Sequence, residues 1–288
     1  MIKAFLKDSG AFQKIFQLII AFFVLLIFTT AVIAVVTQND TSSIGSLKIM
    51  QLIQAIGLFI LPPLVLAYLW SEKPLSYLGF TQRFAFSDLL LVSVFMLVAI
   101  PFINLITSLN QLMILPDILR SVEEWMKASE KQIAEITMKM LNVHTVSGLL
   151  FNILLIAIIP ALGEELFFRA TIQRIFTEWR KAVWGIWIAA FVFSAIHLQF
   201  YGFVPRLLLG AFFGYLYVWS GSLWLPIVAH FVNNAVAVLF YYLQYNGVQL
   251  PDIDRLGTGD TLWLGLLSAL LVIGGVFVLQ KRLPRSRV

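Results

Sequence analysis

Residues 147–169 form the stretch that decides the fold, and they read SGLLFNILLIAIIPALGEELFFR. A helix crosses the hydrocarbon core of a bilayer with about 20 apolar residues, so this stretch is long enough to span a membrane. It nevertheless ends with three ionisable side chains, Glu164, Glu165 and Arg169. A charged side chain at the centre of a bilayer costs about 2.5 to 3.5 kcal/mol on insertion scales, so such residues mark functional sites by default. The stretch indicates a membrane-spanning helix that carries chemistry.

The composition of the whole chain is typical of a membrane protein. Of its 288 residues, 60% are hydrophobic and 12% are charged, and the mean hydropathy is +0.91. Ordinary soluble domains are only about half apolar. We therefore expect an all-α, polytopic fold in which residues 1–288 form a single membrane domain. Cysteine is absent, which excludes disulfides, thiolate metal sites and a cysteine nucleophile.

Apolar stretches of roughly 20 residues, the length of a membrane span, recur along the chain. They lie near residues 15–36, 48–70, 88–112, 147–169, 182–199, 205–220, 223–243 and 261–280. The sequence thus predicts about eight transmembrane helices. The sixth and seventh are separated only by Ser220, Gly221 and Ser222, which we interpret as a tight turn at the membrane surface.

Lysine and arginine residues indicate the orientation, because cytoplasmic loops carry an excess of both. They fall before the first span, between the second and third, between the fourth and fifth, and after the last: Lys3, Lys7, Lys14, Lys73, Arg83, Arg174, Arg180, Lys181, Lys281, Arg282, Arg285 and Arg287. These four positions share one side of an eight-span bundle. The pattern predicts a multi-pass protein of the cell membrane with both termini cytoplasmic. It also accounts for the formal net charge of +5 without a nucleic-acid partner.

The connection at residues 116–141 differs from the apolar spans. Its apolar residues recur at helical spacing, and oppositely charged residues stand four apart, Glu123 with Lys127 and Glu135 with Lys139. The segment is predicted to be an amphipathic helix outside the bilayer. A solvated connector that packs on the bundle or lies among the headgroups and a lid over a substrate site are both compatible with this pattern. The sequence assigns it no chemistry.

Two of the three histidines fall inside apolar spans, His197 in the fifth and His230 in the seventh. Counted from the flanking tryptophans at 1.5 Å per residue, Glu164 and His197 lie at a similar depth, on the order of 20 Å from the same interface. His230 and Asn234 stand at i and i+4 and share one helix face. Glu165 and Arg169 have the same spacing and can form an ion pair, which leaves Glu164 on another face.

These groups suit a hydrolytic centre. A carboxylate held in an apolar environment can act as a general base that activates water. An imidazole and a carboxamide on one helix face could donate hydrogen bonds to the oxyanion of a tetrahedral intermediate. Alternatively, Glu164, His197 and His230 could bind Zn²⁺ with one position open for water. The residues alone leave the choice between glutamate-based and metal-dependent hydrolysis open.

Three motifs occur in order on successive apolar stretches: Glu-Glu-x-x-x-Arg at 164–169, Phe-x-x-x-His at 193–197 and His-x-x-x-Asn at 230–234. Together they resemble the CPBP family, which comprises CaaX proteases and bacteriocin-processing or ABI membrane proteases. The resemblance covers about residues 147–240, which would form the catalytic core. The first three spans and the last match only in general character.

The resemblance implies an intramembrane endopeptidase in which Glu164 activates water with the help of His197. His230 and Asn234 would then stabilise the oxyanion, and Glu165 and Arg169 would support the site. The family has been described both as metal-dependent and as glutamate-based, so Zn²⁺ is an implied cofactor with divided support. The implied partners are the lipid bilayer and a membrane-associated peptide or protein substrate, with lipidated CaaX-like and bacteriocin-type substrates as the candidate classes.

Two other functions would also place ionisable residues inside a helical bundle. An ion- or proton-coupled transporter keeps Glu and His residues there, but many transporters have two related halves. In this chain all intramembrane Glu and His residues lie between residues 164 and 230. A catalytically inert scaffold or immunity protein of the same fold is the other alternative, and it requires none of the candidate catalytic groups.

Overall fold

The computed structural model describes residues 2–40 and 42–283, and the regular structure in these ranges is entirely helical. Within these residues seven helices are long and apolar enough to cross a membrane: Ala11–Thr37, Ile44–Trp70, Phe86–Gln111, Val146–Trp179, Phe200–Ser220, Trp224–Tyr245 and Gly259–Arg282. The remaining predicted span is the shorter apolar helix α10 (Ala182–Ala195). The predicted all-α fold class is confirmed.

Several spans combine more than one helical segment. The regular α-helices are α1 (Ala11–Thr37), α2 (Ile44–Gln54), α3 (Leu61–Trp70), α4 (Pro74–Tyr77), α5 (Phe86–Gln111), α6 (Arg120–Leu141), α7 (Val146–Asn152), α8 (Ile159–Phe167), α9 (Arg174–Trp179), α10, α11 (Phe203–Ser220), α12 (Trp224–Tyr245) and α13 (Leu262–Arg282). Wider π-helical turns join some of them: η1 (Ala55–Ile60), η3 (Ile153–Ile158) and η4 (Phe168–Gln173). Short 3₁₀ turns occupy η2 (Asp117–Leu119), η5 (Phe200–Gly202), η6 (Ile253–Arg255) and η7 (Gly259–Thr261).

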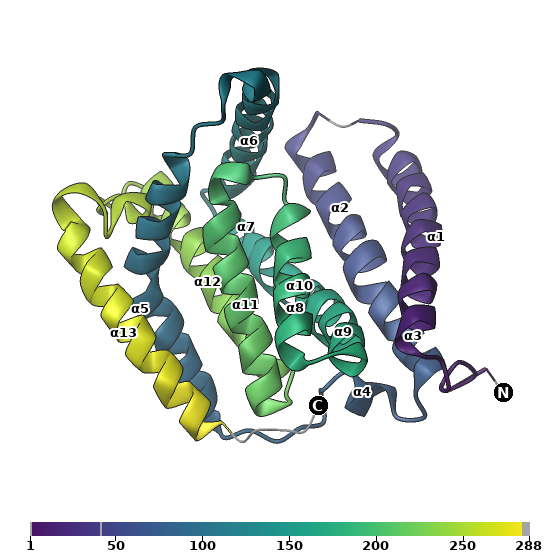
Figure 1. Cartoon of the computed structure of the whole chain (residues 1–288). Coiled ribbons are helices and arrows are strands. Elements are labelled where there is room, and N and C mark those ends of the chain that lie inside the picture. Colours follow the sequence, from purple (N-terminus) through teal and green to yellow (C-terminus); the bar gives the residue numbers. More distant parts are fainter. Residues whose placement is uncertain (1, 41, 284–288) are drawn as a thin grey trace.

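The helices form a bundle, and the polar residues of the three candidate motifs lie near its centre. Helices α5 and α13 pack together at one edge, and α1 and α2 lie at the opposite edge (Figure 1). Helices α8, α10, α11 and α12 lie between them. Their inner side chains, such as Ala161, Leu216 and Ala229, are fully buried. All three candidate motifs therefore fall on central helices or at their ends.

The span that contains the acidic pair is interrupted on both sides of it. The π-helical turn η3 precedes α8, whose first turn holds Pro160, and the π-helical turn η4 follows. Proline lacks a backbone donor and so disfavours a regular continuation of the preceding helix. Such π-turns inside α-helices occur frequently at functional sites. Glu164 and Glu165 thus lie on a nine-residue α-helix between two wider turns.

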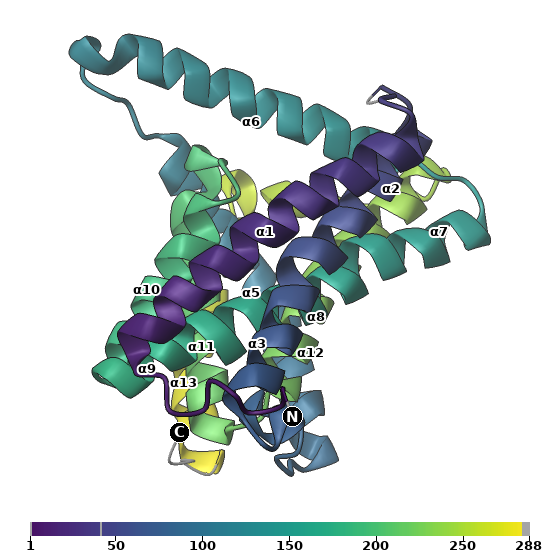
Figure 2. The ribbon, with the colours of Figure 1, turned by 90° about the vertical axis from the view of Figure 1, so that its right-hand side faces the viewer.

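Helix α6 extends along one end of the bundle and is largely exposed (Figure 2). It matches the amphipathic helix predicted at 116–141. Glu123 and Lys127 pair at 2.5 Å as expected, whereas among the described residues no ion pair joins Glu135 to Lys139. At its C-terminal end, the Met140 carbonyl accepts a hydrogen bond from the buried Asn152 amide at 2.9 Å. This bond fixes α6 to the start of the fourth span.

The ends of the spans agree with the charge pattern. The start of α1 and the end of α13 lie at one end of the bundle, and α6 lies at the other (Figures 1 and 2). At the first end, Lys14 pairs with Glu178 at 2.7 Å and Arg282 pairs with Asp88 at 2.7 Å. Assigning this end to the cytoplasm stays a prediction from the lysine and arginine excess.

The close packing of α10 against η4 and α9 can be tested by a substitution at Gly185. A Cβ atom added at Gly185 would lie 2.5 Å from the Gln173 carbonyl oxygen. Because the obstacle is backbone, we expect Gly185→Ala to destabilise the protein by about 1 to 3 kcal/mol and to lower its midpoint of thermal unfolding in detergent. Gly274→Ala is the control, since no atom lies within 4 Å of a Cβ there. Equal midpoints for the two variants would contradict the packing.

Candidate active site

The two adjacent glutamates of α8 have different environments. The Glu165 side chain is 0% exposed, and its Oε2 lies 2.9 Å from the Arg169 Nε. The Glu164 side chain is 16% exposed. It lines a cavity and, among the described residues, has no hydrogen-bond partner. The i,i+4 ion pair and the separate face of Glu164 therefore lie as the helical spacing predicts.

Aromatic rings enclose the Arg169 guanidinium, which is itself fully buried. Its central carbon lies 5.2 Å from the ring centroid of Phe193 and 5.9 Å from those of Phe168 and Phe213. Cations are attracted to the faces of such rings, most strongly where water is absent. Arg169 is thus held by one carboxylate and three rings, and its ion pair fixes the position of the Glu165 carboxylate.

His230 connects the two glutamates from α12. Its Nδ1 lies 2.9 Å from Glu165 Oε1, and its Nε2 lies 3.8 Å from Glu164 Oε2. The ring stacks on Phe213 with centroids 5.2 Å apart. A carboxylate can only accept, so Nδ1 carries a proton and Nε2 is the nitrogen that faces Glu164. The sequence assigned Glu165 only to Arg169. The structure adds that Glu165 also orients His230.

His197 lines the same cavity, although its helix is shorter than predicted. The fifth span was expected to reach residue 199, whereas α10 ends at Ala195. Leu198 has a φ of +53°, which a right-handed helix does not accommodate. The His197 Nδ1 donates to the Phe193 carbonyl at 2.6 Å, so Nε2 is an acceptor in the neutral ring. The similar depths predicted for Glu164 and His197 agree with their shared cavity.

Asn234 follows His230 by one helical turn and also lines the cavity. Its Nδ2 donates to the Ile156 carbonyl in η3 at 3.2 Å, and its Oδ1 accepts from Asn233 at 3.2 Å. A carboxamide nitrogen has two hydrogens, so one donor of Asn234 is left for another acceptor. The wider turn at η3 therefore helps to position a side chain on α12.

The cavity has a volume of about 430 Å³. Four predicted site residues line it: Glu164, His197, His230 and Asn234. Glu165 and Arg169 do not line the cavity but form a buried ion pair next to it. Its wall also contains residues that the sequence analysis did not single out, namely Glu130, Gln199 and Arg206. Arg206 did carry a signal, because an arginine at the start of the apolar stretch 205–220 is costly there.

A zinc centre at Glu164, His197 and His230 would need three ligands about 2.0 to 2.2 Å from one ion. Among the residues that the structure describes, no three His, Cys, Asp or Glu side chains come together closely enough to hold a metal ion. The Nδ1 atoms of His230 and His197 are engaged with Glu165 and a backbone carbonyl, so in each ring Nε2 is the nitrogen that would have to reach the ion. The donor set in this structure does not fit a three-ligand zinc centre.

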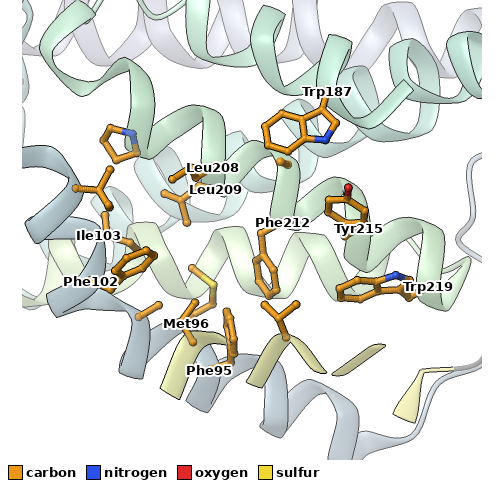
Figure 3. A pocket seen from close by; sticks show the side chains of 16 residues that line it. Phe95, Met96, Phe102, Ile103, Trp187, Leu208, Leu209, Phe212, Tyr215 and Trp219 are labelled. Carbon is orange, nitrogen blue, oxygen red and sulfur yellow. The ribbon is translucent and has the colours of Figure 1, made fainter. Parts of the chain in front are cut away.

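An apolar cavity of about 310 Å³ adjoins the polar one. Aromatic and aliphatic side chains from α5, α10 and α11 line it, among them Phe102, Trp187 and Phe212 (Figure 3). Ile103, Pro205 and Leu209 line both cavities. A group bound in the apolar cavity would therefore lie next to the glutamates and histidines.

Comparison with known proteins bears on the same region of the chain. The chain is 27% identical over 133 residues to the "Uncharacterized protein YpbD" of Bacillus subtilis (strain 168), a match that spans 45% of this chain and 63% of that protein. No solved structure matches the chain. Residues 146–236, which carry all three motifs, match the family described as Type II CAAX prenyl endopeptidase Rce1-like. This segment is therefore similar to the Rce1-like proteins, and the match leaves the rest of the chain uncovered.

Proposed function

We propose that the protein is an intramembrane endopeptidase that hydrolyses peptide bonds of membrane-associated substrates with water activated by Glu164. The observation that carries the proposal is the position of Glu164, which faces the cavity 3.8 Å from His230 Nε2. The buried Glu165 carboxylate, which pairs with both Arg169 and His230, holds this arrangement in place. The match of residues 146–236 to a family of membrane proteases supports the same reaction class.

In the proposed reaction, Glu164 removes a proton from water as the water oxygen attacks the carbonyl carbon of the scissile bond. The protonated Glu164 then gives this proton to the amide nitrogen, and the C–N bond breaks. His197 can hold the second hydrogen of the water through Nε2, since its Nδ1 proton is engaged with Phe193. Each proton that leaves water therefore has an acceptor in the site.

The oxyanion that forms on the carbonyl requires donors in the cavity. Asn234 supplies the amide hydrogen that is not used for Ile156. His230 supplies Nε2–H when its ring is protonated, and Glu165 holds the ring in the necessary orientation. Both donors come from one face of α12, so a single helix would stabilise the charge that develops.

The apolar cavity supports a substrate with a large apolar group close to the cleaved bond, such as aliphatic side chains or a lipid modification. We propose that this chain is a multi-pass protein of the cell membrane with cytoplasmic termini. The substrate would then reach the site from within the bilayer. The CaaX-like and bacteriocin-type classes both meet this requirement. Products from a mixed peptide library will show which apolar groups the site accepts.

Glu164→Gln tests the proposed base. The amide cannot take a proton from water, so we expect cleavage of a peptide library by the protein in liposomes to fall by about 10²- to 10⁴-fold. Glu135→Gln, on the exposed side of α6, serves as the matched control. Equal cleavage by wild type and Glu164→Gln would show that Glu164 is not the base. The absence of any cleavage by wild type would instead favour a transporter or an inert scaffold.

We expect Glu165→Gln to destabilise the folded protein. Removing this charge leaves Arg169 buried without a counter-charge, which costs about 3 to 5 kcal/mol in comparable cases. The midpoint of thermal unfolding should drop strongly, whereas Glu164→Gln should change it little. Glu124→Gln is the control because it breaks an exposed i,i+4 pair with Arg120, which contributes at most about 1 kcal/mol. A Glu165→Gln protein as stable as wild type would contradict the proposed supporting role.

Metal removal distinguishes the two hydrolytic mechanisms. Because the donor set does not fit a three-ligand centre, we expect the wild-type protein to keep its cleavage rate after incubation with a chelator and passage through a desalting column. Loss of cleavage that added Zn²⁺ restores would contradict this expectation. Metal content measured by mass spectrometry on the same samples provides the control.

A further inference from the structure

Arg206 is a cation in the wall of the proposed active-site cavity that the reaction does not use. It lies in the first turn of α11 and is half-buried. Its guanidinium donates to the Gln199 side-chain oxygen and, at 3.4 Å, to the Gln199 backbone carbonyl. Both acceptors are neutral. Across the described residues, no carboxylate lies within 4.0 Å of this guanidinium.

Glu130 supplies a negative charge to the same cavity wall without pairing directly with Arg206. Glu130 of α6 lines the same cavity, but its Oε2 accepts the Tyr201 backbone N–H at 3.1 Å. The neighbouring contact of Trp125 with Phe200, with ring centroids 5.3 Å apart, holds α6 at this place. This contact holds Glu130 on the loop that precedes α11, more than 4.0 Å from the Arg206 guanidinium, so Arg206 can still pair directly with an anion that enters the cavity.

An arginine in a membrane-spanning segment that has no carboxylate in direct contact is costly. The planar guanidinium binds carboxylates through two parallel hydrogen bonds, more strongly than it binds neutral acceptors. The cavity also holds Glu164, so an anion bound at Arg206 would belong to a molecule that reaches the proposed base. A cavity of about 430 Å³ is of the size that holds a small ligand, which places that anion close to the cleaved bond.

We propose that Arg206, positioned by Gln199, is a specificity residue that binds a carboxylate of the substrate peptide near the scissile bond. This inference rests on the proposed peptidase function. The carboxylate is either the free C-terminus of the substrate or the side chain of an acidic residue. In either case, binding replaces the neutral partners of Arg206 with a charged one and fixes the distance between the scissile bond and Glu164.

The test uses apolar decapeptides in three forms: with a free C-terminal carboxylate, with a C-terminal amide, and with a C-terminal amide plus a Glu near the C-terminus. We expect wild type in liposomes to cleave at least one carboxylate form with a kcat/KM about tenfold or more above that of the plain amide. The preferred form identifies the source of the carboxylate. Equal kcat/KM values for all three forms would overturn the inference.

Arg206→Gln should reduce the kcat/KM of the carboxylate form to that of the amide form, mainly through KM. Arg206→Lys should keep part of the preference because it retains the charge. Arg255→Gln is the matched control, since Arg255 is an exposed arginine that pairs with Asp252 outside the cavity. If Arg206 only supports its loop, Arg206→Gln will lower the rates of all three forms equally, and this result would also overturn the inference.

A binding measurement separates this inference from the proposed function. Fluorescence anisotropy of the labelled decapeptides is measured with Glu164→Gln, and with Glu164→Gln combined with Arg206→Gln. Tighter binding of a carboxylate form that disappears with Arg206→Gln supports the carboxylate site, whether or not wild type cleaves the peptide. Cleavage by wild type together with equal binding of all forms would retain the peptidase and reject the carboxylate site.

Discussion

The Glu165 carboxylate is the group on which the rest of the site depends. One oxygen lies 2.9 Å from Arg169 and the other 2.9 Å from His230. All three side chains are buried, and they join the segment α8 and η4 to α12. The cost of burying charges is offset by short ion pairs and further contacts. Among the described residues, Nη1 and Nη2 of Arg169 have no hydrogen-bond partner, so the ring faces are the remaining contacts of the guanidinium. The aromatic rings around Arg169 and His230 exclude water and keep these distances short.

The pairing of Glu165 with Arg169 leaves the Glu164 carboxylate without an arginine partner on its own helix. A neighbouring residue on the same helix takes up the charge of Arg169, so Glu164 can face a cavity with little direct neutralisation. A fully paired Glu164 would be more stable and less able to accept a proton from water. The site thus keeps one carboxylate in a costly environment, and the pair beside it stabilises the helix that carries it. Such a division of roles is expected where function opposes stability.

The sequence predicted what local helical geometry determines. The i,i+4 spacing placed Glu165 next to Arg169 and His230 on the face of Asn234. It could not show that His230 bonds to Glu165, because that contact joins residues 65 positions apart and depends on how α8 and α12 pack. The early end of α10 was also missed, since apolar composition does not reveal the left-handed Leu198.

No local sequence pattern indicated that helix α6 contributes a residue to the cavity wall. Glu130 is one of several carboxylates on an amphipathic helix, and only the docking of α6 on the loop after His197 places it in the cavity wall. Arg206 could have been selected from its position in an apolar stretch, but its neutral partners are visible only in the structure. The grouping of the motif residues was therefore predictable, whereas the far wall of the cavity was not.

The central claim is that Glu164 as base and His230 as oxyanion donor act in the same step, the attack of water on a peptide bond. A double-mutant cycle on kcat/KM with Glu164→Gln, His230→Ala and the combined variant measures this directly. Residues that act together lose activity in a strongly non-additive way. The account predicts that the combined variant is about as slow as the slower single variant. Losses that simply multiply would show that the two residues act independently and would contradict the account.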